Sequence, residues 1–403
     1  MISYGSSLRA CSIETTLGHA RKIAKEIGIV RVTEITPLDR IGVPVFVAIR
    51  PDAPVLCVCA GKGLTAAEAE VGAVMEAIEI AWAEVGRSAL AITPMTVRDV
   101  LDTRQDPMSF VSLCPIWGQQ IDLDAPIVCT PMTDLTNGAT TMVPSELLFF
   151  STTHQPSFFG SSTNGLASGN TVLEATVHGL TEVIERDATS LHLVLDKSVR
   201  IDPTTLPPDL AALAARIESR GFGLLVRSLP SEIGLPVFQA VVFDRSQPWV
   251  TLRGDGCHPS RSIALTRALT ETIQARLCLI HGGRDDLTNV YTAFPNLTAE
   301  EKARIYEDDF RALFARPATA FGDVPEPSIA LDSLEACLDG LLATLRAAGF
   351  PRVLRAVYTP DDYPIQVVRV IVPGLECHSR DARRVGPRLR KLLKRGSAIE
   401  AAR

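Results

Sequence analysis

Residues 61–79 read GKGLTAAEAEVGAVMEAIE, and residues 169–185 read GNTVLEATVHGLTEVIE. Each segment carries a Glu-x-x-Glu pair whose first glutamate lies thirteen positions after a glycine. The matching residues are Gly63, Glu76 and Glu79 in the first segment and Gly169, Glu182 and Glu185 in the second. Glutamates three positions apart on a helix repel each other by roughly a few tenths of a kcal/mol unless a positive charge lies between them. The two pairs therefore predict a bound cation.

Both segments have the apolar periodicity of an amphipathic helix. The predicted helix over residues 65–85 has one apolar stripe, formed by Val71, Val74, Met75, Ile78 and Trp82. The predicted helix over residues 172–188 buries Leu173, Val177, Leu180 and Ile184. In each helix the glutamates follow the flank of the stripe, so the two helices share one design.

A third glycine-rich stretch, Arg253-Gly254-Asp255-Gly256, leads into a predicted helix in which the pattern becomes Glu271-x-x-Gln274. Further helices are predicted at residues 12–28, with Ser12 as N-cap, and at 336–348. Strands are predicted at residues 43–49, 55–59, 224–227, 238–243, 352–358 and 366–372, and connectors at 206–213 and 294–327. Helices and strands alternate loosely and no linker divides the chain, which favours a mixed α/β (α+β) fold with one continuous catalytic unit.

Composition and charge exclude several classes of protein. With 46% hydrophobic and 21% charged residues, the 403-residue chain is typical of a globular enzyme. A net charge of −6 argues against nucleic-acid binding. The sequence shows no signal peptide and no apolar run long enough to span a membrane. We therefore expect a cytoplasmic protein with reduced cysteines. The basic stretch 383–395 is predicted to be a solvated amphipathic helix, with contact to a partner or an acidic peptide as the alternative.

Glutamate oxygens are preferred ligands of Mg²⁺, which often also binds nucleotide phosphates. Taken singly, each Glu-x-x-Glu pair is also typical of a solvated helix flank, and only their repetition favours a site. Arginines such as Arg186, Arg267 and Arg276 could face phosphates, but each could equally be a surface or ion-pair residue. His178 and His258 are predicted to be structural, because neither has the spacing of a zinc site.

The chain resembles the YcaO family, and the resemblance extends over about residues 9–388. It rests on residues 31–45 (RVTEITPLDRIGVPV), on Gly61-Lys62-Gly63 with residues 76–79 (EAIE), on residues 162–170 (STNGLASGN) and on residues 182–187 (EVIERD). The resemblance implies a YcaO-type ATP-binding fold with mixed sheets flanked by helices. It also implies a catalytic domain over 9–388, followed by a basic C-terminal tail over 389–403.

By resemblance, the chain uses ATP and Mg²⁺ to phosphorylate the oxygen of a backbone amide in a peptide or protein. The implied metal ligands are Glu76, Glu79, Glu182 and Glu185. The implied nucleotide-binding residues are Arg9, Thr16, Lys62, Asn170, Glu174, Arg186 and Arg276. The implied catalytic residues are Glu182, Glu185, Arg186 and Gln274, of which Gln274, like Arg276, matches its motif less specifically.

The product depends on the nucleophile: sulfide gives a thioamide, whereas Cys, Ser or Thr gives an azoline. Azoline-forming members commonly end in a Pro-x-Pro-x-Pro tail, but this chain ends in residues 396–403 (GSAIEAAR). Residues 372–376 (VPGLE) and the compact length resemble members that work beside a TfuA partner. We therefore expect peptide thioamidation with a sulfide donor and a TfuA-like partner. An azoline-forming cyclodehydratase and a nonenzymatic nucleotide-binding partner are the alternatives, and the resemblance makes a homodimer plausible.

Overall fold

The computed structural model describes residues 1–102, 110–150, 157–287, 297–306, 312–378 and 383–401. The chain packs as two compact units, each assembled from segments that are distant in sequence. Unit 1 contains Met1, Glu79–Asp196 and Ser328–Arg403, and unit 2 contains Ile2–Ile78 and Lys197–Pro327. The helix α2 (Ala66–Trp82) contributes residues to both. The catalytic region 9–388 and the tail 389–403 stay predictions.

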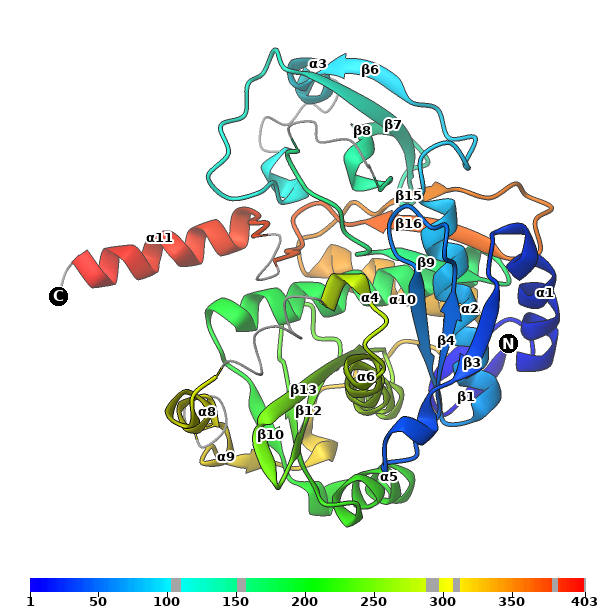
Figure 1. Cartoon of the computed structure of the whole chain (residues 1–403). Coiled ribbons are helices and arrows are strands. Elements are labelled where there is room, and N and C mark those ends of the chain that lie inside the picture. The colour runs from blue at the N-terminus through cyan, green and yellow to red at the C-terminus, as the bar shows by residue number, and fades with distance from the viewer. Residues whose placement is uncertain (103–109, 151–156, 288–296, 307–311, 379–382, 402–403) are drawn as a thin grey trace. The chain divides into compact units, whose positions relative to one another are not determined.

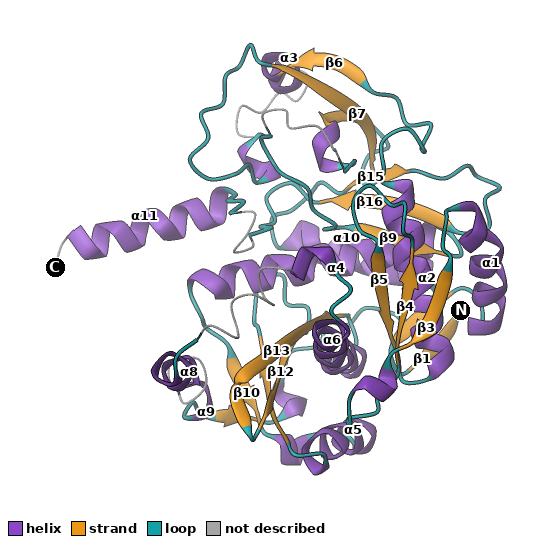
Figure 2. Ribbon diagram, in the orientation of Figure 1, coloured by secondary structure: helices purple, strands orange, loops and turns teal. Residues whose placement is uncertain are grey.

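Unit 2 combines helices with three sheets in its described residues (Figure 2). Its strands are β1 (Ile2–Tyr4), β2 (Ser7–Arg9), β3 (Arg31–Glu34), β4 (Val45–Ile49), β5 (Val58–Lys62), β10 (Val199–Ile201), β11 (Phe222–Ser228), β12 (Val237–Asp244), β13 (Gln247–Cys257) and β14 (Ala318–Thr319). They form the sheets β1-β2, β3-β4-β5 and β13-β12-β11-β10-β14, in which only the pair β10 and β14 is parallel.

The helices of unit 2 besides α2 are α1 (Ile13–Glu26), α5 (Pro208–Ser219), α6 (Arg261–His281), α8 (Ala299–Tyr306) and the short α9 (Ala312–Phe314). Figure 1 shows α6 lying against β12 and β13. Ala264, Ala268 and Ile273 of α6 pack into one apolar core with Phe238 and Ala240 of β12. Small residues on α6 let it lie close to the sheet, which places the Glu271-x-x-Gln274 pair beside the strands.

Unit 1 contains one sheet with the strand order β6-β7-β15-β16-β9, and β8 pairs with β7 beside it. Its strands are β6 (Thr93–Thr96), β7 (Pro126–Asp134), β8 (Thr140–Pro144), β9 (Leu166–Gly169), β15 (Leu354–Val357) and β16 (Gln366–Ile371). Its helices are the end of α2 and α3 (Val97–Asp102), α4 (Val172–Val194), α10 (Leu334–Ala347) and α11 (Pro387–Ala401). The long helix α4 packs on β9 and β16, so the second Glu-x-x-Glu pair also lies on a helix that covers a sheet.

Three strand-to-helix modules recur: β5 leads into α2, β9 into α4 and β13 into α6. In each module glycines of the strand touch the backbone of the following helix. A Cβ on Gly61 would lie 2.0 Å from the backbone nitrogen of Ala73, and a Cβ on Gly256 would lie 2.1 Å from the carbonyl oxygen of Ala264. On Gly169 it would lie 2.7 Å from the backbone nitrogen of Ala175. No side chain fits at these distances, so the glycines serve close strand-helix packing.

This packing corrects one prediction. The strand predicted at residues 55–59 begins and ends three residues later, because β5 covers 58–62 and includes Gly61 and Lys62. Residues 50–57 connect β4 to β5, and the backbone N–H of Arg50 donates to the carbonyl oxygen of Cys57 at 2.8 Å. The glycine-rich stretch 253–256 also lies within a strand, β13.

The other predicted elements are mostly confirmed within a few residues. Ser12 caps α1 by accepting a hydrogen bond from the backbone N–H of Thr15 at 3.2 Å. The connector expected at 206–213 is wrong, because α5 begins at Pro208 and buries Leu210, Ala214 and Ile217 at helical spacing. The connector 294–327 begins outside the described residues, and its described part contains α8, α9 and β14.

Three broader expectations concern the fold class, the cysteines and a membrane span. The mixed α/β fold class is confirmed by the sheets and helices of both units. The cysteines are present as thiols, and Cys257, at the end of β13, is only 1% exposed, so it does not offer an accessible thiol. Among the helices described, none combines the length and apolar character that crossing a bilayer requires.

Candidate nucleotide and metal site

The unit 2 part of the candidate site is centred on Ala60 in β5. The backbone N–H of Ala60 donates to Glu76 Oε2 at 2.6 Å, and the Ala60 carbonyl accepts from Gln274 Nε2 at 2.6 Å. Beside them, Lys62 Nζ lies 2.7 Å from Glu271 Oε2 in a partly exposed ion pair. The structure therefore brings three predicted site residues, Lys62, Glu76 and Gln274, to one strand.

Glu271 is a residue that we did not include among the site candidates. It lies thirteen positions after His258, as Glu76 and Glu182 lie thirteen positions after a glycine, so it holds the equivalent place in the third module. Glu271 Oε1 also accepts from the backbone N–H of Asp255, sixteen positions earlier, as Glu76 does from Ala60. The repeated spacing was the signal that could have identified it.

Glu76 has the electrostatic environment of a cation ligand. Burial raises the pKa of Glu76, and Arg284 and the N–H of Ala60 oppose that rise. Arg284 itself forms an ion pair with Asp286, at 3.0 and 2.7 Å, which weakens the electrostatic stabilisation that its positive charge gives to ionised Glu76. A carboxylate whose burial outweighs the positive charges around it fits a divalent cation, because the cation would restore its ionised form.

In unit 1, Glu79 at the end of α2 contacts β9, and three further candidates, Glu182, Glu185 and Arg186, lie on α4. Glu79 Oε1 accepts from Ser168 twice, from the backbone N–H at 2.8 Å and from the hydroxyl at 2.6 Å. On α4, Glu182 and Arg186 are half-buried and Glu185 is 3% exposed. Glu182 and Arg186 lie four positions apart on the partly accessible stripe of this helix, whose other faces are buried.

Among the residues described, no group of three or more His, Cys, Asp or Glu side chains is arranged to hold a metal ion. Glu76 and Glu79 each use an oxygen to accept protein hydrogen bonds. A carboxylate has two oxygens and about four lone pairs, so these bonds leave capacity for a cation. Glu76 belongs to unit 2, whereas Glu79, Glu182 and Glu185 belong to unit 1, and the four-glutamate metal site stays a prediction.

Asn170 and Glu174 have a structural part at the start of α4. The backbone N–H of Glu174 donates to the N-cap Thr171 Oγ1 at 3.1 Å. Glu174 Oε2 in turn accepts from the backbone and the side chain of Asn170, at 3.1 and 3.2 Å. This arrangement is close to a capping box, which satisfies the first N–H groups of a helix. The predicted nucleotide contacts of both residues stay predictions.

Arg9, Thr16 and Arg276 all lie in unit 2. Arg9 Nε donates to Ser7 Oγ at 3.2 Å, and Thr16 Oγ1 donates to the carbonyl of Ser12 at 2.9 Å. Arg276 forms a two-pronged ion pair with Asp39, at 2.9 and 3.3 Å. The Arg276 contact is typical of a structural ion pair, so to bind phosphate this arginine would have to leave Asp39. The nucleotide-binding role of the three residues stays a prediction.

His258 marks a positive region in unit 2. Burial, together with the positive charges of Arg267 and Arg9, lowers the pKa of His258 to about 3. Its Nδ1 accepts from the backbone N–H of Ser260 at 3.0 Å, just before α6 begins, which agrees with the structural histidine that we predicted. Two arginines beside a neutral, buried ring provide permanent positive charge of the kind that phosphate needs.

A buried aspartate follows Arg186 directly. Asp187 is 0% exposed, and burial raises its pKa to about 6 against the lowering effect of Arg388. It was not among our candidates, although it ends the quoted motif EVIERD. Because it is enclosed, Asp187 is not placed to contact a substrate.

A small cavity in unit 1 lies between the segments around Cys114, Asn164 and Arg369. Its volume is about 30 Å³, which is room for little more than water. Arg369 is fully used there by the carbonyl oxygens of Ser162, Asn164 and Leu148. The cavity therefore does not suit a peptide substrate.

Comparison with known proteins identifies the family. The sequence profile described as "YcaO cyclodehydratase, ATP- and Mg²⁺-binding" matches residues 60–376. An uncharacterised protein of Methanothermobacter thermautotrophicus is 36% identical over 375 residues, covering 90% of this chain and 94% of that protein. A protein of Rhizobium leguminosarum bv. trifolii, described as lying in the tfuA 3′ region, is 32% identical over 383 residues. The match covers 91% of this chain and 88% of that protein.

Among solved structures, YcaO from Methanopyrus kandleri bound with AMPPCP and Mg²⁺ superposes with a TM-score of 0.75 and 26% identity, covering 96% of this chain and 97% of that one. The structural likeness extends over nearly the whole chain. The family's description confirms ATP and Mg²⁺ as the cofactors that the paired glutamates and the resemblance predicted. The two glutamate pairs, the three related strand-to-helix modules and the extent of these matches lead to one conclusion: the chain belongs to the YcaO family.

Proposed function

We propose that this protein activates a backbone amide of a peptide or protein with ATP and Mg²⁺, and that it installs a thioamide with a sulfide donor and a TfuA-like partner. The repeated Glu-x-x-Glu pairs support ATP-dependent chemistry. The observation that carries the thioamide hypothesis is the 32% identical relative in the tfuA 3′ region. The cytoplasm as its location and a homodimer as its assembly stay part of the proposal.

An amide resists nucleophilic attack because its carbonyl is a poor electrophile and its oxygen a poor leaving group. Bound ATP supplies the phosphoryl group that turns this oxygen into a leaving group, and Mg²⁺ neutralises the phosphate charge. The protein's task is to hold both reactants and to place positive charge where negative charge develops.

The residues of this chain divide that task. Glu76, Glu79, Glu182 and Glu185 would hold the metal. Arg186, on the accessible stripe of α4, would face phosphate, since a guanidinium carries a permanent charge and several donors. Lys62 would face phosphate after exchanging its present partner Glu271. Gln274 would keep β5 in place through Ala60, close to Glu76.

Azoline formation is the second candidate. It is favoured by the family's description as cyclodehydratases. The chemistry up to amide activation would be the same, and only the nucleophile would differ: a Cys, Ser or Thr side chain of the peptide in place of sulfide.

The product can be read from the peptides of a strain with and without this gene, by intact-mass and fragment mass spectrometry. Replacement of oxygen by sulfur at one backbone amide is the result expected for thioamidation. Loss of water at a Cys, Ser or Thr would instead establish azoline formation. Unchanged peptides, together with undetectable ATP consumption in the presence of the peptide, would refute both and indicate an accessory nucleotide-binding protein.

The metal assignment has its own test. The Glu182→Gln variant should lose product formation and keep its thermal unfolding midpoint, because the substitution removes a charge from a half-buried position without changing shape. Glu335→Gln is the matched control: it removes the same charge from the exposed first turn of α10 and should keep full activity. Product formed at the wild-type rate by Glu182→Gln would overturn the assignment.

A further inference from the structure

A buried carboxylate outside the candidate site caps the C-terminal helix. Glu376, which follows β16, is 0% exposed. Its Oε2 accepts from the backbone N–H of Gly386 at 2.6 Å, and its Oε1 accepts from those of Arg388 and Leu389 at 2.8 and 3.0 Å. These donors lie at the start of α11, where backbone N–H groups have no partner within the helix. A negative charge is also favourable at this end of a helix.

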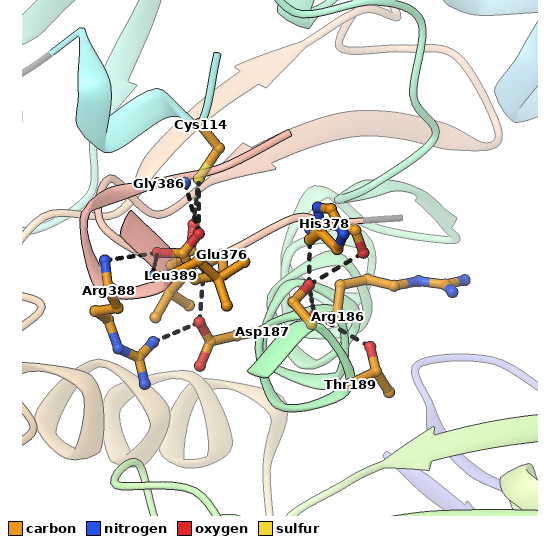
Figure 3. A network of polar contacts seen from close by, with 11 residues as sticks. Cys114, Arg186, Asp187, Thr189, Glu376, His378, Gly386, Arg388 and Leu389 are labelled. Atoms are coloured by element: carbon orange, nitrogen blue, oxygen red, sulfur yellow. Dashed lines mark hydrogen bonds and ion pairs between the residues drawn. The ribbon is translucent and has the colours of Figure 1, made fainter. Parts of the chain in front are cut away.

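The same carboxylate residue is bound to α4. Asp187 Oδ1 accepts from the backbone N–H of Glu376 at 2.7 Å and also from Nη1 of Arg388, which is the residue that Glu376 caps. Figure 3 shows the polar contacts that join Asp187 on α4 to Glu376 and Arg388. The three residues thus close a ring of polar contacts, which we call the α4–α11 latch.

A second tether lies one turn further along α4. The hydroxyl of Ser190 accepts from the backbone N–H of His378 at 2.8 Å and donates to the carbonyl of Arg186. His378 Nδ1 is in turn 3.0 Å from the carbonyl of Arg384. Glu376, His378 and Arg388, which we call the C-terminal segment, are therefore attached to α4 at two successive turns. These attachments restrain both the position of α4 and its rotation about its own axis.

The latch is tightly packed. A Cβ on Gly386 would lie 2.5 Å from Cys114 Sγ and 2.8 Å from Glu376 Oε2, so only glycine fits there. Arg388 packs over the ring of Phe350, 5.2 Å from its centre, while it pairs with Asp187. Asp187 and Glu376 are fully buried, and buried charged groups that are satisfied in this way hold a fixed geometry.

The latch holds the part of α4 that carries the candidate site. Asp187 comes directly after Arg186 and two residues after Glu185. Figure 3 shows the side chain of Arg186 extending away from Asp187 and Glu376. Because successive residues of a helix point about 100° apart, fixing Asp187 on the buried side sets the direction in which Arg186 and the glutamates point.

We propose that Asp187, Glu376 and Arg388 are positioning residues for Mg·ATP: they set the orientation of Glu182, Glu185 and Arg186, and so make the C-terminal segment a necessary part of the nucleotide site. The inference rests on the proposed placement of Mg·ATP at α4. Partners that orient metal ligands typically alter metal affinity by about 10–100-fold when mutated.

The test measures binding of AMPPCP by calorimetry to the purified full chain, with Mg²⁺ titrated, and requires no peptide. Arg388→Met is expected to raise the Mg²⁺ concentration needed for half-maximal AMPPCP affinity about tenfold. Arg388→Lys keeps the charge beside Asp187 and should recover most of that loss. Arg390→Met is the matched control, since Arg390 lies on the same helix and packs over Trp117 without entering the latch.

Asp187→Asn provides a second variant that removes the charge from the other side of the ion pair, and its effect should not add to that of Arg388→Met. If Asp187→Asn does not fold, the pair Arg388→Met and Arg388→Lys decides alone. Equal losses of affinity in Arg388→Met and Arg390→Met, or no loss in either, would overturn the inference. Glu182→Gln separates the two proposals: if that variant binds Mg²⁺ and AMPPCP as the wild type does, the placement of the site itself has failed.

Discussion

Replacing Gly61 by alanine tests the strand-helix packing on which the candidate site depends. The new Cβ would lie 2.0 Å from the backbone nitrogen of Ala73 and 2.1 Å from the carbonyl oxygen of Ala69. Ordinary contacts begin at 3.4 Å, and both opposing atoms belong to the backbone, which cannot rotate aside as a side chain can. The strand β5 and the helix α2 must therefore separate by more than an ångström.

Overpacking a core typically costs about 1–3 kcal/mol, and we expect Gly61→Ala to lie at or above the upper end because backbone must move. The thermal unfolding midpoint should then fall by roughly 5–10 °C. Gly18→Ala is the matched control. Gly18 is exposed within α1 and has nothing within 4 Å of a new Cβ, so alanine should stabilise the protein there by about 0.5–1 kcal/mol.

The assay is thermal unfolding of both variants, with AMPPCP affinity measured on the folded protein below the transition. Opposite shifts in the unfolding midpoint, down for Gly61→Ala and up for Gly18→Ala, are the expected result. A Gly61→Ala protein that melts with the wild type but no longer binds AMPPCP would refute the reasoning.

Two further predictions concern ionisable groups of unit 2. Burial raises the pKa of Glu76, so without a cation its ionised carboxylate opposes folding at neutral pH. The Glu76→Gln variant keeps the oxygen that accepts from the backbone N–H of Ala60 and should unfold at no lower temperature than the metal-free wild type. It should also lose the rise in unfolding temperature that Mg²⁺ and AMPPCP give the wild type. A ligand-induced shift of wild-type size in that variant would contradict it. The pKa of His258 is lowered to about 3, so its neutral form contributes stability above the usual pKa near 6.5, and this is lost as pH falls between those values. In the His258→Asn variant, the urea midpoint should therefore fall less steeply between pH 6.5 and pH 4. The free energy of unfolding of the two proteins should differ in slope by at most about 1.4 kcal/mol per pH unit, and equal slopes would exclude this contribution.

Sequence reasoning worked well where the interactions are local. The helices that carry Glu76, Glu182 and Glu271 follow from apolar periodicity, because core-facing residues recur every three or four positions. The N-cap at Ser12 follows from a bond between residues three apart. The sequence also predicted the mixed fold class and, through its motifs, the family and its cofactors.

The family resemblance supplied more of the candidate site than the residue pattern did. Spacing alone identified the two Glu-x-x-Glu pairs and their need for a cation. Spacing could also have identified Glu271, because the third module repeats it with His258 in place of the glycine. The nucleotide-binding residues came from the resemblance, and the structure adds structural contacts for several of them, such as Glu174 at the start of α4.

What the sequence by itself determined is therefore the local framework: periodic helices, their caps, and a spacing of carboxylates that calls for a cation. Only the tertiary structure decided that Gly61 serves close packing, that Glu79 binds Ser168, and that Asp187 and Glu376 join α4 to the C-terminal helix. The last two contacts connect residues 89 and 189 positions apart. No local pattern encodes such pairs, because they exist only once sheets and helices have packed and brought distant segments together.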